Sequence, residues 1–311
     1  MITIPLPAKK IFFIILCLLF LTPFLSAPIA LLSGFLFTNL FGNPFDSLSK
    51  KTVKWLLKAS VVGLGFGMFL QKTIETGKDG LILTVITIVL TITLGVLLGK
   101  LLKIDKAIAY LISTGTSICG GSAIAAVSSV INAKDKQISI ALGVVFFLNA
   151  LAIFIFPALG NLLELSQHEF GIWSAIAIHD TSSVVGAAMA YGEEALDTAI
   201  TVKLARALWI IPVSLISMFI YKSDNGKIKI PWFIFLFILA ILANSFLDLP
   251  SFITSYVPAI SKQLLVLTLF LVGTGLSIKT IKSTGFMPIL LGVLLWITIS
   301  VISLLYILNF S

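Results

Sequence analysis

Long apolar runs separated by short polar connections make up most of the chain. An α-helix needs about 20 predominantly apolar residues to cross the hydrocarbon layer of a membrane. Eleven runs of roughly this kind can be assigned, at about residues 11–26, 27–43, 52–70, 80–101, 107–132, 137–160, 171–191, 195–221, 230–247, 262–281 and 286–309. The pattern predicts an all-α polytopic membrane protein with about eleven transmembrane helices, in a single integral membrane domain over residues 1–311.

The first apolar run has two interpretations. Two lysines before it and small residues near Ala27 are typical of a cleaved signal peptide. Pro28 is a poor residue after a cleavage site, however, and ten residues precede the run. We therefore predict that residues 1–26 form an extra N-terminal spanning helix.

Composition excludes a soluble enzyme. Of the 311 residues, 59% are hydrophobic and only 11% are charged, whereas a soluble domain carries about 25% charged residues. The two cysteines, Cys17 and Cys119, cannot build a disulfide framework. In a membrane protein a net charge of +8 reports orientation in the membrane, so no nucleic-acid partner is expected.

The lysines in the connections indicate that orientation. Cytoplasmic loops of membrane proteins are enriched in lysine and arginine. With the N-terminus inside, thirteen lysines fall on the cytoplasmic side: Lys9, Lys10, Lys50, Lys51, Lys54, Lys100, Lys103, Lys106, Lys222, Lys227, Lys229, Lys279 and Lys282. Five fall on the opposite side: Lys72, Lys78, Lys134, Lys136 and Lys262. This asymmetry supports eleven spans, with a cytoplasmic N-terminus and a C-terminus outside.

A weak internal similarity suggests two repeats. Residues 111–118 resemble residues 271–278 at an offset of 160 residues. Five spans separate them, and an odd number reverses orientation, so the offset predicts two inverted five-helix repeats over residues 27–160 and 170–309. A rival match at an offset of 208 residues also implies inversion. Short matches of glycine and threonine between apolar helices also arise by chance.

A polar, glycine-containing stretch from Ser113 to Ser122 interrupts the fifth apolar segment. Adjacent glycines weaken a helix, and hydroxyl groups can take over the backbone hydrogen bonds where it breaks. The N–H groups of the following half-helix would then favour an anion. A helix-packing seam of small residues is the alternative. The candidate ligands in this stretch are Thr116, Ser117, Cys119, Gly120, Gly121 and Ser122.

Ionisable residues also lie in the middle of the seventh segment. His179 and Asp180, followed by Ser182 and Ser183, lie about halfway between the ends of the segment. Charged groups at that depth cost a few kcal/mol each, so they are seldom retained without a partner or a role. His179 can change protonation near neutral pH, while Asp180 can hold it, bind a cation or pair with a base. A structural polar contact between helices is the alternative.

Arg206, in the eighth segment, is the single arginine of the chain. A guanidinium group is a planar fork of donors that matches oxyanions and carboxylates. Lys203 lies three residues earlier on the same helix face, although it could instead snorkel to the surface. An ion pair between Arg206 and Asp180 is the structural alternative.

Two further polar residues are secondary candidates. Asn149 can hydrogen-bond across the bundle, and Lys58 is expected to snorkel to the cytoplasmic surface. We find no Walker motif, zinc-ligand spacing or nucleophile elbow. The sequence therefore predicts no metal, no cofactor and no enzymatic activity.

Residues 115–124, residues 179–187 and the pair Lys203 and Arg206 together resemble the bacterial YeiH-like family, whose members are labelled sulfate exporters. The similarity covers the chain from about the second segment onward. That family is similar to a superfamily of cation/proton antiporters and anion transporters with a core domain, two crossing broken helices and a panel domain. The resemblance implies a location in the bacterial inner membrane. It also implies that segments five and ten cross, which adds Thr274, Gly275 and Ser277 to the site.

The leading hypothesis is therefore a secondary transporter of a small oxyanion, such as sulfate, sulfite or an organosulfonate. Arg206, Lys203 and the two crossing stretches would bind the anion, while His179, Asp180, Ser182, Ser183 and Asn149 would couple its movement to H⁺ or Na⁺. The alternatives are a cation antiporter that uses Asp180 as its ion site, and a membrane scaffold that transports nothing. The expected partners are the anion, a coupling ion and membrane lipids, with a homodimer as one candidate assembly.

Overall fold

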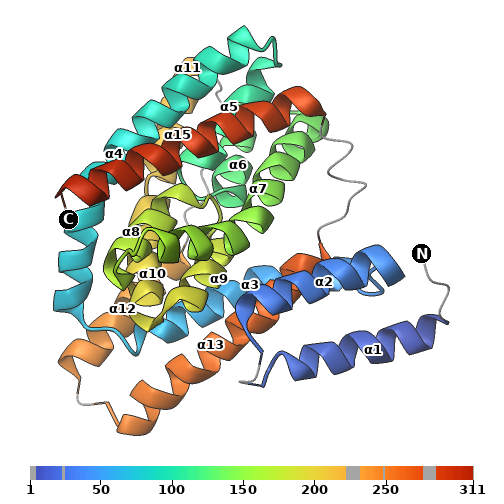
Figure 1. The fold of residues 1–311 in the computed structure, drawn as a ribbon, viewed down its shortest axis with the longest axis vertical. Helices are drawn as coiled ribbons and strands as arrows, with labels where there is room; N and C mark the ends of the chain where they lie inside the picture. The colour runs from blue at the N-terminus through green and yellow to red at the C-terminus, as the bar shows by residue number, and fades with distance from the viewer. Residues whose placement is uncertain (1–4, 23–24, 222–231, 248, 276–284, 311) are drawn as a thin grey trace.

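The computed structural model describes residues 5–22, 25–221, 232–247, 249–275 and 285–310 (Figure 1). These parts of the chain are helical and contain no strand. Their helices are α1 (Leu6–Leu19), α2 (Ala27–Phe41), α3 (Asp46–Gly65), α4 (Leu70–Leu101), α5 (Lys106–Ser117), α6 (Gly121–Val130), α7 (Asp135–Leu162), α8 (Gln167–Ala177), α9 (Thr181–Tyr191), α10 (Glu193–Ala207), α11 (Ile210–Tyr221), α12 (Phe233–Phe246), α13 (Ser251–Thr274) and α15 (Phe286–Phe310).

Helices occupy each of the eleven predicted segments, and segments five, seven and eight each contain two of them. Five stretches are long and apolar enough to cross a membrane: Ile82–Leu101, Asp135–Leu162, Glu193–Tyr221, Ser251–Thr274 and Phe286–Asn309. Shorter apolar helices include α2, α6 and α12. The prediction of an all-α polytopic protein agrees with these helices, while the number of crossings and the inverted repeats stay predictions.

Four helices begin at least five residues earlier than predicted: α1, α3, α4 and α13. The first four turns of α3, from Asp46, contain four lysines, and α13 begins at Ser251, directly after Pro250 at its N-cap. Hydropathy identifies only the apolar part of a helix. The predicted segments therefore leave out the amphipathic start of α3 and the more polar start of α13.

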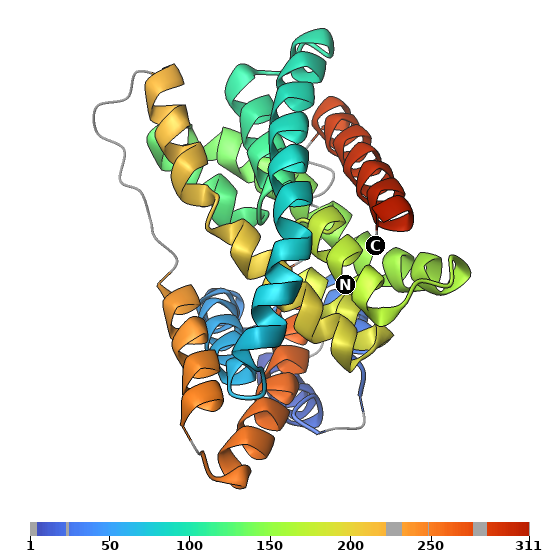
Figure 2. The ribbon, with the colours of Figure 1, turned by 90° about the vertical axis from the view of Figure 1, so that its left-hand side faces the viewer.

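The helices form two groups, which lie toward opposite ends of the molecule in two views (Figures 1 and 2). We call α1, α2, α3, α12 and α13 the end group, and α4 to α11 with α15 the central group. Within the end group, α13 packs along α2 and α3. The groups meet mainly where α9 contacts α2 and α13.

Close backbone approach joins α2 to α13. A Cβ atom on Gly34 would lie 2.1 Å from the carbonyl oxygen of Phe270, and one on Gly273 would lie 2.1 Å from that of Leu31. These neighbours are backbone atoms, so a side chain at either position can be accommodated only by moving the helices apart.

We expect Gly34→Ala to destabilise the protein by about 1–3 kcal/mol because of this overpacking. Thermal unfolding of the purified protein in detergent measures the effect. Leu32→Ala, at an exposed position of the same helix, is the matched control and should cost much less. Equal melting temperatures for the two variants would contradict the close packing of α2 on α13.

Candidate functional site

The fifth segment breaks between Ser117, the last residue of α5, and Gly121, the first residue of α6. Gly120 has a φ of +62°, in the left-handed region that a glycine adopts without steric cost. Its N–H donates to the carbonyl oxygen of Gly115 at 2.8 Å, which closes the end of α5. The predicted break in this segment is therefore present, and it follows from the Gly120-Gly121 pair.

The seventh segment breaks between Ala177, at the end of α8, and Thr181, at the start of α9. Asp180 is the N-cap of α9, and its carboxylate accepts a hydrogen bond from the backbone N–H of Ser182 at 3.1 Å. The hydroxyl of Ser182 donates to the same carboxylate oxygen. Aspartate is among the preferred N-cap residues, so the sequence from Asp180 onward restarts the helix.

The two breaks lie against each other. A Cβ atom on Gly120 would be 3.2 Å from the Cβ of Asp180. Asn149, on α7, joins the second break, because its side-chain oxygen accepts from the backbone N–H groups of His179 at 3.1 Å and Asp180 at 3.3 Å. Residues from three segments thus form one site, which we call the break junction: Thr116, Ser117, Cys119, Gly120, Asn149, His179 and Asp180.

Two cationic side chains of α10 bind the C-terminal ends of half-helices. Lys203 binds the end of α8, and Arg206 binds the ends of both α5 and α8. Both side chains are fully buried. The ammonium group of Lys203 donates to the carbonyl oxygens of Ala175 at 3.1 Å and Ile178 at 2.7 Å. In these positions it offsets the negative end of the α8 dipole.

The guanidinium of Arg206 spans both breaks. Its Nε donates to the carbonyl oxygen of Ser117 at 2.7 Å, Nη2 donates to the same oxygen, and Nη1 donates to the carbonyl oxygen of Ile176 at 3.1 Å. Arg206 therefore ties the end of α5 to the end of α8. The proposed pairing of this arginine with Asp180 is not formed, since the ion pairs among the described residues are Lys50 with Asp46 and Lys262 with Glu193.

The charges at the junction do not balance. Lys203 and Arg206 are buried beside it, and Asp180 is the one carboxylate among the residues that form it. With His179 counted as neutral, one positive charge is in excess. The N-terminus of α6 lies at Gly120 and Gly121, and no described side chain caps it. Both features favour a negatively charged ligand.

Several buried polar atoms at the junction have no hydrogen-bond partner among the described residues. They are Thr116 Oγ1, Asn149 Nδ2, and both ring nitrogens of His179. All three side chains are at most 3% exposed. An unpartnered buried donor or acceptor costs about 1–3 kcal/mol, so a group that persists in this state is a candidate for ligand binding.

Some predicted site residues lie elsewhere. Ser122 is exposed, whereas Ser182 and Ser183 are buried beside Asp180 in the first turn of α9. The carbonyl oxygen of Thr274 accepts from the hydroxyl of Thr38 at 2.7 Å, and its hydroxyl accepts from Asn43 at 3.1 Å. Thr274 is thus bound to α2 and the residues after it.

The break that meets segment five among the described residues is in segment seven. The crossing of segments five and ten, which the family resemblance implies, stays a prediction, because residues 276–284 lie outside the described part of the chain. The helix α13 is continuous from Ser251 to Thr274. Gly275 directly follows it, and Ser277 lies outside the described residues. Gly273, which belongs to the stretch that resembles segment five, lies against the backbone of α2.

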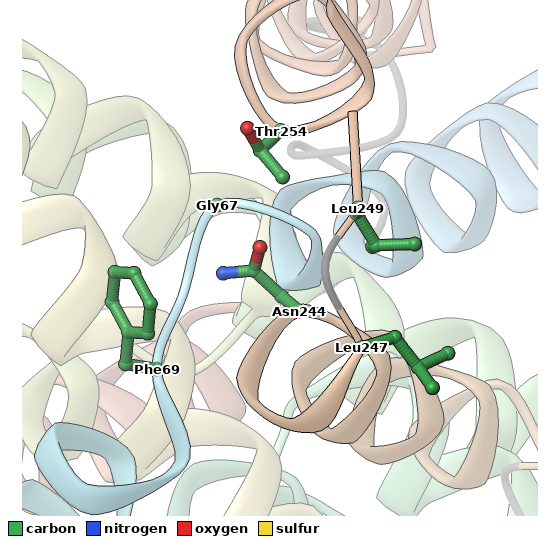
Figure 3. Close-up of a pocket in the computed structure, with 6 residues that line it drawn as sticks. All are labelled: Gly67, Phe69, Asn244, Leu247, Leu249 and Thr254. Atoms are coloured by element: carbon green, nitrogen blue, oxygen red, sulfur yellow. The ribbon is translucent and has the colours of Figure 1, made fainter. Parts of the chain in front are cut away.

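An open pocket of about 350 Å³ lies elsewhere, where the connection between α3 and α4 meets the end of α12 and the start of α13 (Figure 3). The described residues that line it are Gly67, Phe69, Asn244, Leu247, Leu249 and Thr254. None of the predicted site residues is among them. The amide of Asn244 donates to the carbonyl oxygen of Met68 at 3.1 Å, so it holds this connection in place. The described residues also contain no group of three or more metal-ligand side chains.

Comparison with known proteins identifies relatives over nearly the whole chain. The family model described as conserved hypothetical protein 698 matches residues 11–292. A UPF0324 membrane protein from Bacteroides thetaiotaomicron is 51% identical over 285 residues, covering 91% of this chain and 86% of the relative. One from Photobacterium profundum is 50% identical over 303 residues, covering 97% and 93%. No solved structure matches. These matches confirm the family expected from the two motifs, and together with the apolar helices they indicate a multi-pass membrane protein.

Proposed function

We propose that this chain, which belongs to the UPF0324 family of membrane proteins (conserved hypothetical protein 698), is a secondary transporter of a small oxyanion. Sulfate, sulfite or an organosulfonate fits the proposal best, since each is compact and rich in hydrogen-bond acceptors. The proposed location is the bacterial inner membrane, with the N-terminus in the cytoplasm.

The observation that carries the proposal is the set of unpartnered buried groups beside an excess positive charge. Thr116, Asn149 and His179 contribute a hydroxyl, an amide and an imidazole without a partner in the described structure. An oxyanion would accept hydrogen bonds from these groups and from the N–H groups at the start of α6.

Lys203 and Arg206 have a different role from the one first expected of them. Their hydrogen bonds go to backbone carbonyl oxygens, so they hold the half-helices in register and supply a fixed positive potential. The anion would be contacted directly by the unpartnered groups of the junction, on Thr116, Asn149 and His179.

Asp180 and His179 are the proposed coupling residues. Asp180 is half-buried, whereas His179 is fully buried. Binding H⁺ or Na⁺ at this pair would compensate part of the anion's charge during transport. The central group, which holds the junction, would move against the end group to expose the anion first on one side of the membrane and then on the other.

Flux in proteoliposomes tests the proposal. Uptake of labelled sulfate, sulfite and an organosulfonate is measured with an imposed H⁺ or Na⁺ gradient. We expect saturable anion uptake that depends on one of these gradients. Na⁺/H⁺ exchange without anion uptake would support the cation antiporter instead. Absence of both, with no thermal stabilisation by any anion, would support a scaffold.

We expect Thr116→Val to raise the KM for the transported anion roughly tenfold, because a hydrogen bond to a charged group is worth about 1.5–3 kcal/mol. Melting temperature without anion should stay equal or rise, since valine removes an unsatisfied hydroxyl. Thr114→Val is the matched control on the same helix, because the Thr114 hydroxyl already donates to the backbone carbonyl oxygen of Tyr110 at 2.9 Å. An equal KM in both variants would contradict anion binding by Thr116.

A further inference from the structure

Two tryptophans and one lysine form a cluster on the surface of the end group, far in sequence from the break junction. Lys58 Nζ lies 5.5 Å from the ring centre of Trp55 and 5.5 Å from that of Trp232. The two indole rings are 5.9 Å apart and inclined at 53°. Trp55 comes from α3 and Trp232 from the start of α12, so packing of these helices builds the cluster.

Further lysines extend the cluster along α3. At about 100° per residue, Lys51, Lys54, Trp55 and Lys58 all fall within an arc of roughly 100° on the helix. Trp55 is 64% exposed and Trp232 is 45% exposed. The opposite face of α3, which includes Ser49, Ser60 and Leu64, is buried. The basic and aromatic residues therefore face outward together.

Within the described part of the chain, no ion pair neutralises the lysines that lie beside the two indoles. Lys50 forms an ion pair with Asp46 at 2.6 Å, which uses the acidic residue in the first turn of α3. Among the described ion pairs none involves Lys51, Lys54 or Lys58. Two exposed lysines and the half-buried Lys58 thus lie on the same face as two exposed indoles.

We propose that this face binds the headgroup of an anionic glycerophospholipid. Tryptophan side chains favour the level of the lipid headgroups, and lysines next to them attract anionic lipids of the cytoplasmic leaflet. The indoles lie against the glycerol and upper acyl region, and the three ammonium groups bind the phosphate. Lys58 is oriented by the two rings, so it makes the central contact.

Native mass spectrometry of the full chain in detergent, mixed with equal amounts of phosphatidylglycerol and phosphatidylcholine, tests this site. We expect at least about fivefold more bound phosphatidylglycerol, given the attraction of each lysine for an anionic surface. Combined Lys51→Gln, Lys54→Gln and Lys58→Gln should abolish the preference. Added inorganic phosphate should not displace the lipid, because it lacks the apolar part that contacts the indoles.

The matched control is the combination Lys100→Gln, Lys103→Gln and Lys106→Gln, which removes the same charge from the end of α4, its connection to α5 and the start of α5. It should keep the preference. Equal loss in both combinations, or no preference in the unaltered protein, would overturn the proposal. If the first combination does not fold, Lys58→Gln alone should lower the preference at least twofold, and an unchanged preference would overturn the proposal. None of these measurements depends on transport.

Discussion

Arg206→Ala is expected to lower the free energy of unfolding by about 2–6 kcal/mol. The substitution leaves the buried carbonyl oxygens of Ser117 and Ile176 without the donors they have now, and each unsatisfied buried acceptor costs about 1–3 kcal/mol. It also frees the end of α5 from the end of α8. Thermal unfolding in detergent should show a fall of at least about 5 °C, and transport should be lost with it.

Arg206→Lys separates charge from geometry. Lysine keeps the positive charge but cannot reach two carbonyl groups with a planar fork, so a smaller fall in stability is expected. Lys100→Ala, at an exposed position near the end of α4, controls for the loss of a cation in general. If Arg206→Ala abolished anion transport while its melting temperature stayed unchanged, Arg206 would be a direct anion ligand and its role as a tie between the helices would be wrong.

Asn149→Asp is expected to reduce anion transport by about 100-fold or more with little loss of stability. The carboxylate can still accept from the N–H groups of His179 and Asp180, as the amide oxygen does now. The substitution removes the unpartnered Nδ2 donor, and the negative charge of the new carboxylate cancels the excess positive charge at the junction. At about 4 Å and an effective dielectric constant near 20, one added charge is worth about 4 kcal/mol, enough for an effect of that size.

This substitution also distinguishes the two transport hypotheses. An anion carrier should lose uptake of sulfate and related anions, whereas a cation antiporter should keep or gain Na⁺ flux from an added carboxylate. Asn161→Asp makes the same chemical change at an exposed position of α7 and should leave flux unaltered. Uptake of sulfate by Asn149→Asp at the rate of the unaltered protein would contradict the anion site.

Much of the fold follows from local properties of the chain. Apolar runs reveal helices whatever their neighbours, because every backbone polar group in lipid must be paired within its own helix. The break after Ser117 could be predicted because Gly120 and Gly121 act locally. Asn149 was also expected to hydrogen-bond across the bundle, and it does so with the backbone of His179 and Asp180. Which segment it would contact could not be predicted, since that depends on how the helices pack.

The sequence by itself thus determined the helical class, the approximate segments and the unusual residues His179, Asp180, Lys203 and Arg206 inside them. Only the tertiary structure decided that segment seven meets segment five, and that Lys203 and Arg206 bind backbone carbonyl groups. The physical reason is that those acceptors are main-chain oxygens, which every residue has. They become distinctive only where a helix ends and the fold buries that end beside a cation.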